Sequence, residues 1–312
     1  MKPQRLIVFI FSLGLLGCSD TKDYFLAEKD LIPEGTSYNP DEELLYIGSI
    51  YHQKILSLDK QGKTSVVVPK SHFGKFSPLG IAYDPGTKKL WACMAMAPIV
   101  NKGQVARWET TIMSFDPQNG QPLKAYQRLS ADKPMLLNDL TITDDGTVYV
   151  TESINKRIYE ISPEGDSLRV FFELENETFP NGITHRREDL FIATDQGIAK
   201  VNIRSKASQL LTAAPGVDAT LIDGLEIHED YFIGHQSSKV MKFYFDPSIS
   251  MLTESEVLDN RKELDSSTTG VVADGDYYFI VNSQLHSGID QSTKTVKPLD
   301  SLETVIIRKI RL

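Results

Sequence analysis

Four side chains that carry metal-binding oxygens recur at one position of a phrase repeated along the 312-residue chain. They are two carboxylates and two amides, and each belongs to a short turn signal: Glu34, Asn138, Asn181 and Asp223. A hard divalent cation such as Ca²⁺ prefers these oxygens, with water completing roughly six to eight ligands. No His or Cys stands at these positions, which disfavours zinc or copper. We therefore expect a divalent metal, foremost Ca²⁺, with Mn²⁺, Zn²⁺ and Mg²⁺ as alternatives.

Taken alone, each of these residues would be explained by a structural role in a turn, because Asn, Asp and Gly are common in tight turns. The shared phase of the repeat is what favours one common site. The third residues of the six turn signals are separated by 45, 59, 43, 42 and 46 residues. The six signals are Pro33-Glu34-Gly35, Pro78-Leu79-Gly80, Leu137-Asn138-Asp139, Pro180-Asn181-Gly182, Ile222-Asp223-Gly224 and Thr268-Thr269-Gly270.

The elements that must position these side chains are short strands. Each turn signal is followed by an apolar stretch, an acidic or Gly turn, and two more strand-like runs. A period near forty built from short strands is typical of a β-propeller. We predict an all-β, six-bladed propeller with four-stranded antiparallel blades and an insertion in blade 2 between Met94 and Ile112. The last repeat lacks one strand, and residues 23–27 are expected to supply it and close the ring.

The antiparallel meander predicts where the turn signals meet. Each one starts the innermost strand of its blade, so the six signals converge on one mouth of the central channel. The residues expected to surround this mouth are Glu34, Leu79, Asn138, Asn181, Asp223 and Thr269. Loops after the second strands reach the same end and bring His235 and Gln236, which we expect to contact the substrate. His235 is either a base near neutral pH or a hydrogen-bonded structural residue.

The first seventeen residues have the layout of an export signal. Lys2 and Arg5 precede an apolar run of eleven residues, too short to span a bilayer as a lasting helix. Leu15-Leu16-Gly17-Cys18 resembles a bacterial lipobox, so Cys18 is the expected lipidation site; an ordinary cleaved signal is the alternative. We divide the chain into a signal peptide (1–17), a lipidated tether (18–22) and the propeller (23–312). The expected location is periplasmic or at the cell surface, on a membrane.

Composition narrows the class of partner. The net charge is −9, and it becomes −11 once residues 1–17, with two basic and no acidic side chains, are removed. Such an excess of acidic over basic side chains argues against nucleic-acid binding. The one other cysteine, Cys93, lies in an apolar strand-like run and is expected to be a buried thiol. We expect a monomer that binds a small molecule and touches the membrane only through its lipid anchor.

With these residues placed, the chain resembles the regucalcin–gluconolactonase family of six-bladed propellers and, more distantly, the paraoxonases. The resemblance covers roughly residues 30–285. It implies that Glu34, Asn138, Asn181 and Asp223 hold a divalent metal, usually Ca²⁺, which polarises a lactone or ester carbonyl. It also implies that Asp223 is the general base, and that Asp139 orients the substrate or supports a metal ligand.

The chain departs from the family pattern at the substrate side. Gluconolactonases place an Arg two residues before the Asn-Asp pair, where this chain has Leu136. Leu136 and Leu79 are expected to contact the substrate and make the mouth apolar, which favours a hydrophobic lactone or ester over a sugar lactone. The leading hypothesis is a metal-dependent lactonase or esterase. The alternatives are a non-catalytic ligand- or partner-binding propeller that keeps the metal, and a structural propeller without a ligand.

Overall fold

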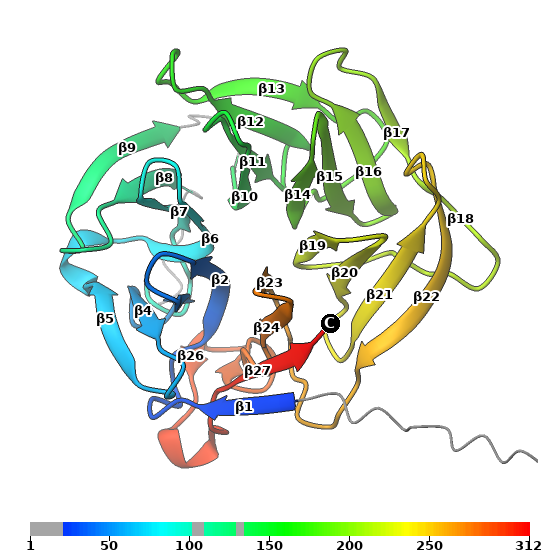
Figure 1. The fold of residues 1–312 in the computed structure, drawn as a ribbon. Coiled ribbons are helices and arrows are strands. Elements are labelled where there is room, and N and C mark those ends of the chain that lie inside the picture. The colour runs from blue at the N-terminus through cyan, green and yellow to red at the C-terminus, as the bar shows by residue number, and fades with distance from the viewer. Residues whose placement is uncertain (1–20, 102–108, 129–133) are drawn as a thin grey trace, which may run out of the picture.

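Six β-sheets stand around a central channel (Figure 1). The computed structural model describes residues 21–101, 109–128 and 134–312. The sheets follow one another along the chain, and in each the first strand lies at the channel and later strands lie toward the rim (Figure 1). The predicted six-bladed β-propeller with four-stranded antiparallel blades is confirmed.

Blades 1 to 3 contain β2 (Pro33–Asn39), β3 (Leu44–Ser49), β4 (Lys54–Leu58) and β5 (Thr64–Val68); β6 (Ser77–Asp84), β7 (Lys89–Ala95), β8 (Thr110–Phe115) and β9 (Pro122–Arg128); and β10 (Leu137–Ile142), β11 (Val148–Glu152), β12 (Arg157–Ile161) and β13 (Arg169–Glu173). Blades 4 to 6 contain β14 (Ile183–Arg186), β15 (Asp189–Thr194), β16 (Gly197–Asn202) and β17 (Ser208–Leu210); β19 (Leu225–His228), β20 (Tyr231–His235), β21 (Val240–Phe245) and β22 (Met251–Asp259); and β23 (Gly270–Ala273), β24 (Asp276–Ile280), β27 (Ile306–Arg311) and β1 (Thr21–Phe25). A short strand, β18 (Thr212–Ala213), runs parallel to β22 at the rim of blade 5. Outside the blades lie the hairpin β25 (Ile289–Asp290) and β26 (Thr295–Val296) and two single-turn 3₁₀ helices, η1 (Lys70–His72) and η2 (Leu299–Ser301).

Blade 6 is closed by the N-terminal strand, as predicted. β1 pairs antiparallel with β27, and the pairing begins with Thr21 opposite Ile310. The strand therefore starts two residues earlier than expected, and the last two residues of the predicted 18–22 tether belong to the propeller. The Arg308 guanidinium on β27 stabilises the pairing with β1, because it donates to Asp23 on β1 at 2.7 Å and to Asp259 on blade 5 at 2.8 Å. The predicted signal peptide and the predicted lipidation site, Cys18, lie outside the described residues.

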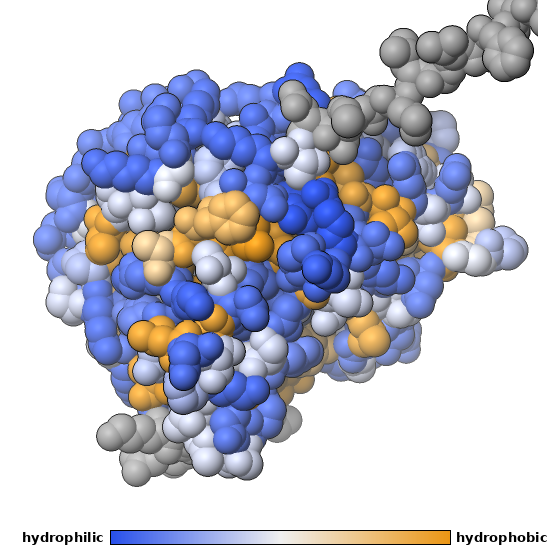
Figure 2. All heavy atoms as spheres, turned by 90° about the horizontal axis from the view of Figure 1, so that it is seen from below, coloured by the Kyte–Doolittle hydropathy of each residue, from blue (hydrophilic) through white to orange (hydrophobic). Residues whose placement is uncertain are grey.

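The apolar core lies between neighbouring blades. Phe191 of blade 4 packs on Phe232 of blade 5 with ring centroids 5.0 Å apart, and Tyr46 packs on Tyr83 between blades 1 and 2. Each blade thus buries both faces against its neighbours, which explains why the strands read as nearly continuous apolar runs. On the side of the ring shown in Figure 2, apolar residues form a broken band among hydrophilic ones. Among the described residues, no helix is long and apolar enough to cross a membrane.

Glycines let the innermost strands approach closely. A Cβ at Gly182 would lie 2.5 Å from the carbonyl oxygen of Asp223, and one at Gly224 would lie 2.5 Å from that of Thr268. The N–H groups of these glycines instead donate to the same oxygens at 2.8 and 2.7 Å. The turn signals of blades 4 and 5 are therefore each bonded to the next blade through the backbone.

The same bonds correct the predicted phase of blade 6. The carbonyl oxygen of Thr268 accepts from Gly224 as that of Asp223 accepts from Gly182, so Thr268 is the residue equivalent to Asp223. Thr269, which the sequence placed at the mouth, occupies the position of the glycines. Its hydroxyl donates to the carbonyl oxygen of Glu34 at 2.6 Å and fills the gap to blade 1.

Two long excursions gather at the mouth of the channel. One follows β7 in blade 2, the predicted insertion, of which residues 102–108 lie outside the described part. The other joins β24 to β27 and carries the β25–β26 hairpin, which the sequence reading did not predict. The two excursions share one apolar cluster, in which Ile50 and Ile289 are buried and are packed by Ile99 and Leu285.

Candidate functional site

A chain of hydrogen bonds joins three of the predicted metal ligands. The Asn138 amide donates from Nδ2 to Oδ1 of Asn181 at 2.8 Å, and the Asn181 amide donates to Oδ1 of Asp223 at 2.8 Å. These residues begin or immediately precede the innermost strands of blades 3, 4 and 5. The repeat phase read from the sequence thus brings together side chains that are 43 and 42 residues apart.

Side chains at the end of β11 fix both amides. Ser153 Oγ donates to the carbonyl oxygen of Pro180 at 2.7 Å and accepts from Nδ2 of Asn138 at 3.0 Å. Thr151 Oγ1 donates to the carbonyl oxygen of Asn181 at 2.7 Å. Because these hydroxyls are buried, the amides are held in place before any ligand arrives.

Glu34 supplies a buried carboxylate without enough hydrogen-bond donors. Its Oε2 atom is buried and has no hydrogen-bond partner among the described residues. Burial, followed by the charges of Asp223 and Asp139, raises the pKa of Glu34 well above its usual value. Burial also raises the pKa of Asp223 to about 7; the hydrogen bond from Asn181 opposes this and the charge on Asp139 adds to it. Buried carboxylates crowded in this way are stabilised by a cation.

The donor set fits a hard cation that accepts amide oxygens. Within the described ranges, no group of three or more His, Cys, Asp or Glu side chains is arranged to hold a metal ion. A metal at this mouth would therefore need the oxygens of Asn138 or Asn181 in addition to Glu34 and Asp223. Oxygen-only coordination suits Ca²⁺ or Mg²⁺ better than Zn²⁺.

A cavity of about 440 Å³ opens directly onto these four residues. Leu79 and Leu136, the predicted substrate contacts, line it. Most of the remaining wall comes from the two excursions: Ala95, Met96, Ala97, Pro98, Ile99, Leu285, His286, Ile289, Gln291 and Lys294. Of residues 285–294, the sequence placed only His286 in a loop near the mouth; the signal for the others was the long unrepeated stretch inside the last repeat.

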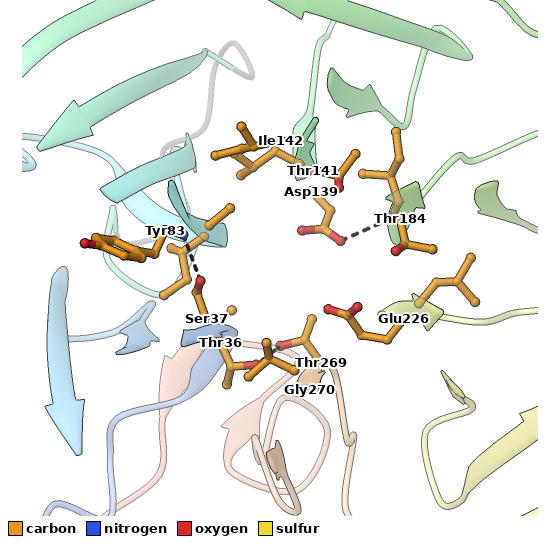
Figure 3. Close-up of a pocket in the computed structure, with 18 residues that line it drawn as sticks. Thr36, Ser37, Tyr83, Asp139, Thr141, Ile142, Thr184, Glu226, Thr269 and Gly270 are labelled. Atoms are coloured by element: carbon orange, nitrogen blue, oxygen red, sulfur yellow. Dashed lines mark hydrogen bonds between the residues drawn. The ribbon is translucent and has the colours of Figure 1, made fainter. Parts of the chain in front are cut away.

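Asp139 faces away from this cavity. It occupies a glycine position of the repeat, and its side chain enters the central channel, where a cavity of about 180 Å³ is lined by Asp139 and Glu226 (Figure 3). A Cβ at Gly80 would lie 2.3 Å from the Asp139 carboxylate, so blade 2 requires glycine there. Burial raises the pKa of Asp139 to about 6, against the effect of N–H donors from Leu140 and Ile183. The geometry favours support of the ring over contact with a substrate in the mouth.

Glu226 is a second channel carboxylate that the sequence reading did not single out. It projects into the channel near Asp139 and Thr269 (Figure 3). Burial raises the pKa of Glu226 to about 8, the charge on Asp139 adds to this, and the Ile227 N–H opposes it. A carboxyl group with this pKa is largely protonated at neutral pH.

His235 and Gln236 are not part of the mouth surface. His235 is fully buried, and its ring nitrogens contact Ser267 Oγ at 2.8 Å and Tyr277 Oη at 2.6 Å. Burial lowers the pKa of His235 to about 3, so the ring is neutral and structural. Gln236 Nε2 donates to the carbonyl oxygens of Asp218 and Thr220, which ties it to the segment between β18 and β19. Of the two alternatives for His235, the structure favours the hydrogen-bonded structural residue.

Comparison with known proteins places the fold and leaves the activity open. No protein-family model and no curated protein sequence matches the chain. Among solved structures, it is similar to a gluconolactonase from Xanthomonas campestris (TM-score 0.66, 14% identity, 95% of this chain and 91% of that chain). It is also similar to the allergen Mala s 1 of Malassezia sympodialis (0.69, 14%, 92% and 95%) and to a streptogramin B lyase (0.60, 12%, 94% and 97%).

These likenesses show a shared six-bladed propeller fold, and at the level of the fold they bear out the resemblance to gluconolactonase-like propellers. Propellers of this shape include a lactonase and a lyase, so fold alone does not select the reaction. The function has to be inferred from the residues at the mouth of the channel.

Proposed function

We propose that this protein is a divalent-metal-dependent hydrolase of lactones or esters. The observation that carries the proposal is the Glu34 carboxylate, whose buried Oε2 has no partner beside the linked Asn181 and Asp223 at the floor of a cavity. A cation would satisfy that oxygen and offset the charge of both carboxylates. The apolar walls of the cavity agree with a hydrophobic substrate.

The residues at the mouth would have three different roles: binding the ion, accepting a proton and contacting the substrate. Glu34, Asn138, Asn181 and Asp223 would hold the ion, foremost Ca²⁺, which when bound polarises a carbonyl and stabilises the negative charge that develops on its oxygen. Asp223, held by Asn181, would accept a proton from the attacking water. Leu79 and Leu136 would hold the apolar part of the substrate and exclude water.

Turnover of a panel of lactones and aryl esters with added Ca²⁺, Mn²⁺, Mg²⁺ or Zn²⁺ tests the proposal. We expect hydrolysis that EDTA abolishes, and a loss of at least about a hundredfold in kcat for Asp223→Asn. Asp300→Asn, on the exposed η2 turn, is the matched control and should leave turnover unchanged. The proposal fails if no substrate is turned over with any metal and elemental analysis finds none bound.

The second candidate is a non-catalytic propeller that binds a small ligand and retains the ion. It is favoured by the burial of His235 and the turning of Asp139 into the channel, which leave few proton-transfer groups at the mouth. Asp223→Asn separates the two candidates. An enzyme loses turnover, whereas a binding protein keeps its ligand affinity as long as the ion stays bound.

The location remains part of the proposal. An acyl chain on Cys18 would tether the propeller to a membrane surface, close to β1, where the described chain begins. Metabolic labelling with a fatty acid should mark the wild type and leave Cys18→Ser unlabelled. Equal labelling of both proteins would rule out Cys18 as the anchor.

A further inference from the structure

The mouth contains two adjoining cavities. Beside the apolar one of about 440 Å³ lies a second of about 220 Å³. We call them the apolar chamber and the polar chamber. They share a dividing wall that contains two of the proposed metal ligands: Phe179, Asn181, Asp223, Leu285 and His286.

The two chambers differ in chemistry. Around the apolar chamber, residues such as Ile50, Ile99 and Ile289 form most of the wall. To the dividing wall, the polar chamber adds Asp195, Ser237, Ser266 and Ser267, together with the apolar Leu221 and Ile222. No Lys or Arg is among the described residues that line it, and Asp195 is a carboxylate outside the proposed metal-ligand set.

The dividing wall is held in place by an unusual backbone conformation. Phe179 lies at φ 51°, in the left-handed region that bulky side chains rarely adopt, and its side chain is 42% exposed between the chambers. Leu221, at the same distance before Asp223, lies at φ 52° and lines the polar chamber. Strained backbone at a cavity persists only where the surrounding structure enforces it, and it is common at ligand sites.

We propose that the mouth binds one amphipathic carbonyl compound in two halves, with an aliphatic or aromatic acyl arm in the apolar chamber and a hydroxylated or cationic group in the polar chamber. The inference rests on the proposed function in that the carbonyl would lie at the dividing wall, beside Asn181 and Asp223. It assigns a substrate class: esters or lactones of apolar acids that carry a polar, non-anionic second half. An anionic group in the polar chamber would be repelled by Asp195, and a free carboxylate would bind the ion at the dividing wall in place of the carbonyl.

The sizes agree with this division. The apolar chamber is about three times the volume of a cavity of about 150 Å³ that holds one benzene molecule. It has room for a medium-length acyl chain, and each buried methylene should tighten binding about fourfold. An exposed charge pair with Asp195 would add a factor of up to about five at low salt.

Binding of uncleavable amides separates this inference from turnover. Calorimetry with the full-length protein in calcium buffer would compare N-alkanoyl-ethylenediamines from acetyl to octanoyl with the corresponding N-propyl alkanamides, in which an uncharged propyl group replaces the aminoethyl group. For the ethylenediamines, we expect Kd to fall about fourfold per methylene until the apolar chamber is filled. The ammonium series should bind more tightly than the propyl series.

Two substitutions address the chambers one at a time. Ala97→Phe fills the apolar chamber and should remove the chain-length dependence, whereas Ala207→Phe, on an exposed turn of blade 4, should leave it intact. Asp195→Asn should narrow the preference for the ammonium series by up to about fivefold. Asp300→Asn, at an exposed residue that does not line the polar chamber, should leave this preference unchanged.

The inference is overturned if Kd is independent of chain length in the wild type, if Ala97→Phe keeps the wild-type slope, or if the propyl series binds more tightly than the ammonium series. Ester turnover combined with such a result would leave the proposed function standing and remove only the two-chamber assignment. Chain-length-dependent binding without any turnover would leave the two-chamber assignment standing and remove the proposed hydrolase function.

Discussion

Glu226 offers a test of the electrostatics of the channel that does not depend on the substrate. The carboxyl group is forced into the interior, where burial raises its pKa from a usual 4.5 to about 8. At about 1.4 kcal/mol per pH unit, that interval corresponds to at most about 5 kcal/mol of lost stability at alkaline pH. Glu226 keeps part of its surface open to the channel, and water there reduces the penalty to about 1–3 kcal/mol.

The direction in which stability changes with pH follows from the number of protons bound in the folded and unfolded states. Between pH 4.5 and about 8 the folded protein holds a proton on Glu226 that the unfolded chain has lost, so stability falls as the pH rises through this range. Below pH 4.5 both states are protonated and the difference vanishes. Glu226→Gln removes the titration while keeping the shape. In urea unfolding with EDTA present, the variant should be about 1–3 kcal/mol more stable than the wild type near pH 8.5 and equal to it near pH 4.

The control is Glu164→Gln, a substitution of an exposed carboxylate on a turn of blade 3, which should show no such pH-dependent gain. A Glu226→Gln variant whose stability difference from the wild type does not change with pH would refute the reasoning. A variant that loses stability at pH 8.5 would also refute it, because the charged carboxylate would then be stabilising the fold.

Three further predictions concern the ring and its closure. Gly182→Ala should lower the free energy of unfolding by about 1–3 kcal/mol, because its Cβ would meet a backbone oxygen 2.5 Å away. Gly48→Ala is the control and should be nearly neutral, because the nearest atom to its Cβ is 3.5 Å away. Equal effects of the two substitutions in urea unfolding would contradict this prediction. Glu34→Gln should weaken Ca²⁺ binding in calorimetry by at least about tenfold without lowering the metal-free Tm, and unchanged affinity would remove Glu34 from the ligand set. Arg308→Met should lower the free energy of unfolding by about 3–5 kcal/mol, because the Asp259 side chain is fully buried and loses its main partner. A loss below about 1 kcal/mol would contradict this prediction.

Much of the fold was readable from the sequence because a propeller repeats one local pattern. Each turn signal is local chemistry, and the spacing of the signals fixes how many blades must close the ring. The pairing of β1 with β27 followed from counting strands in the last repeat. The candidate ligands Asn138, Asn181 and Asp223 came together for the same reason, since equivalent positions of a repeat lie at the same height around the channel.

Other features could not be read, because they depend on contacts between blades. Which threonine of blade 6 stands at the mouth was decided by the hydrogen bond from Gly224 to Thr268. Whether Asp139 faces the mouth or the channel was decided by the glycine opposite it in blade 2. The burial of His235 required Tyr277 of the neighbouring blade as a partner.

The sequence by itself determined the repeat, and with it the six blades and the place where oxygen ligands converge. Only the tertiary structure decided which side chains reach that place, because a side chain's direction depends on strand register and on what the adjoining blade leaves open. Apart from Leu79 and Leu136, the walls of the mouth belong to this second kind of information. They come from two excursions with no counterpart in the repeat, which are packed together by Ile50, Ile99 and Ile289.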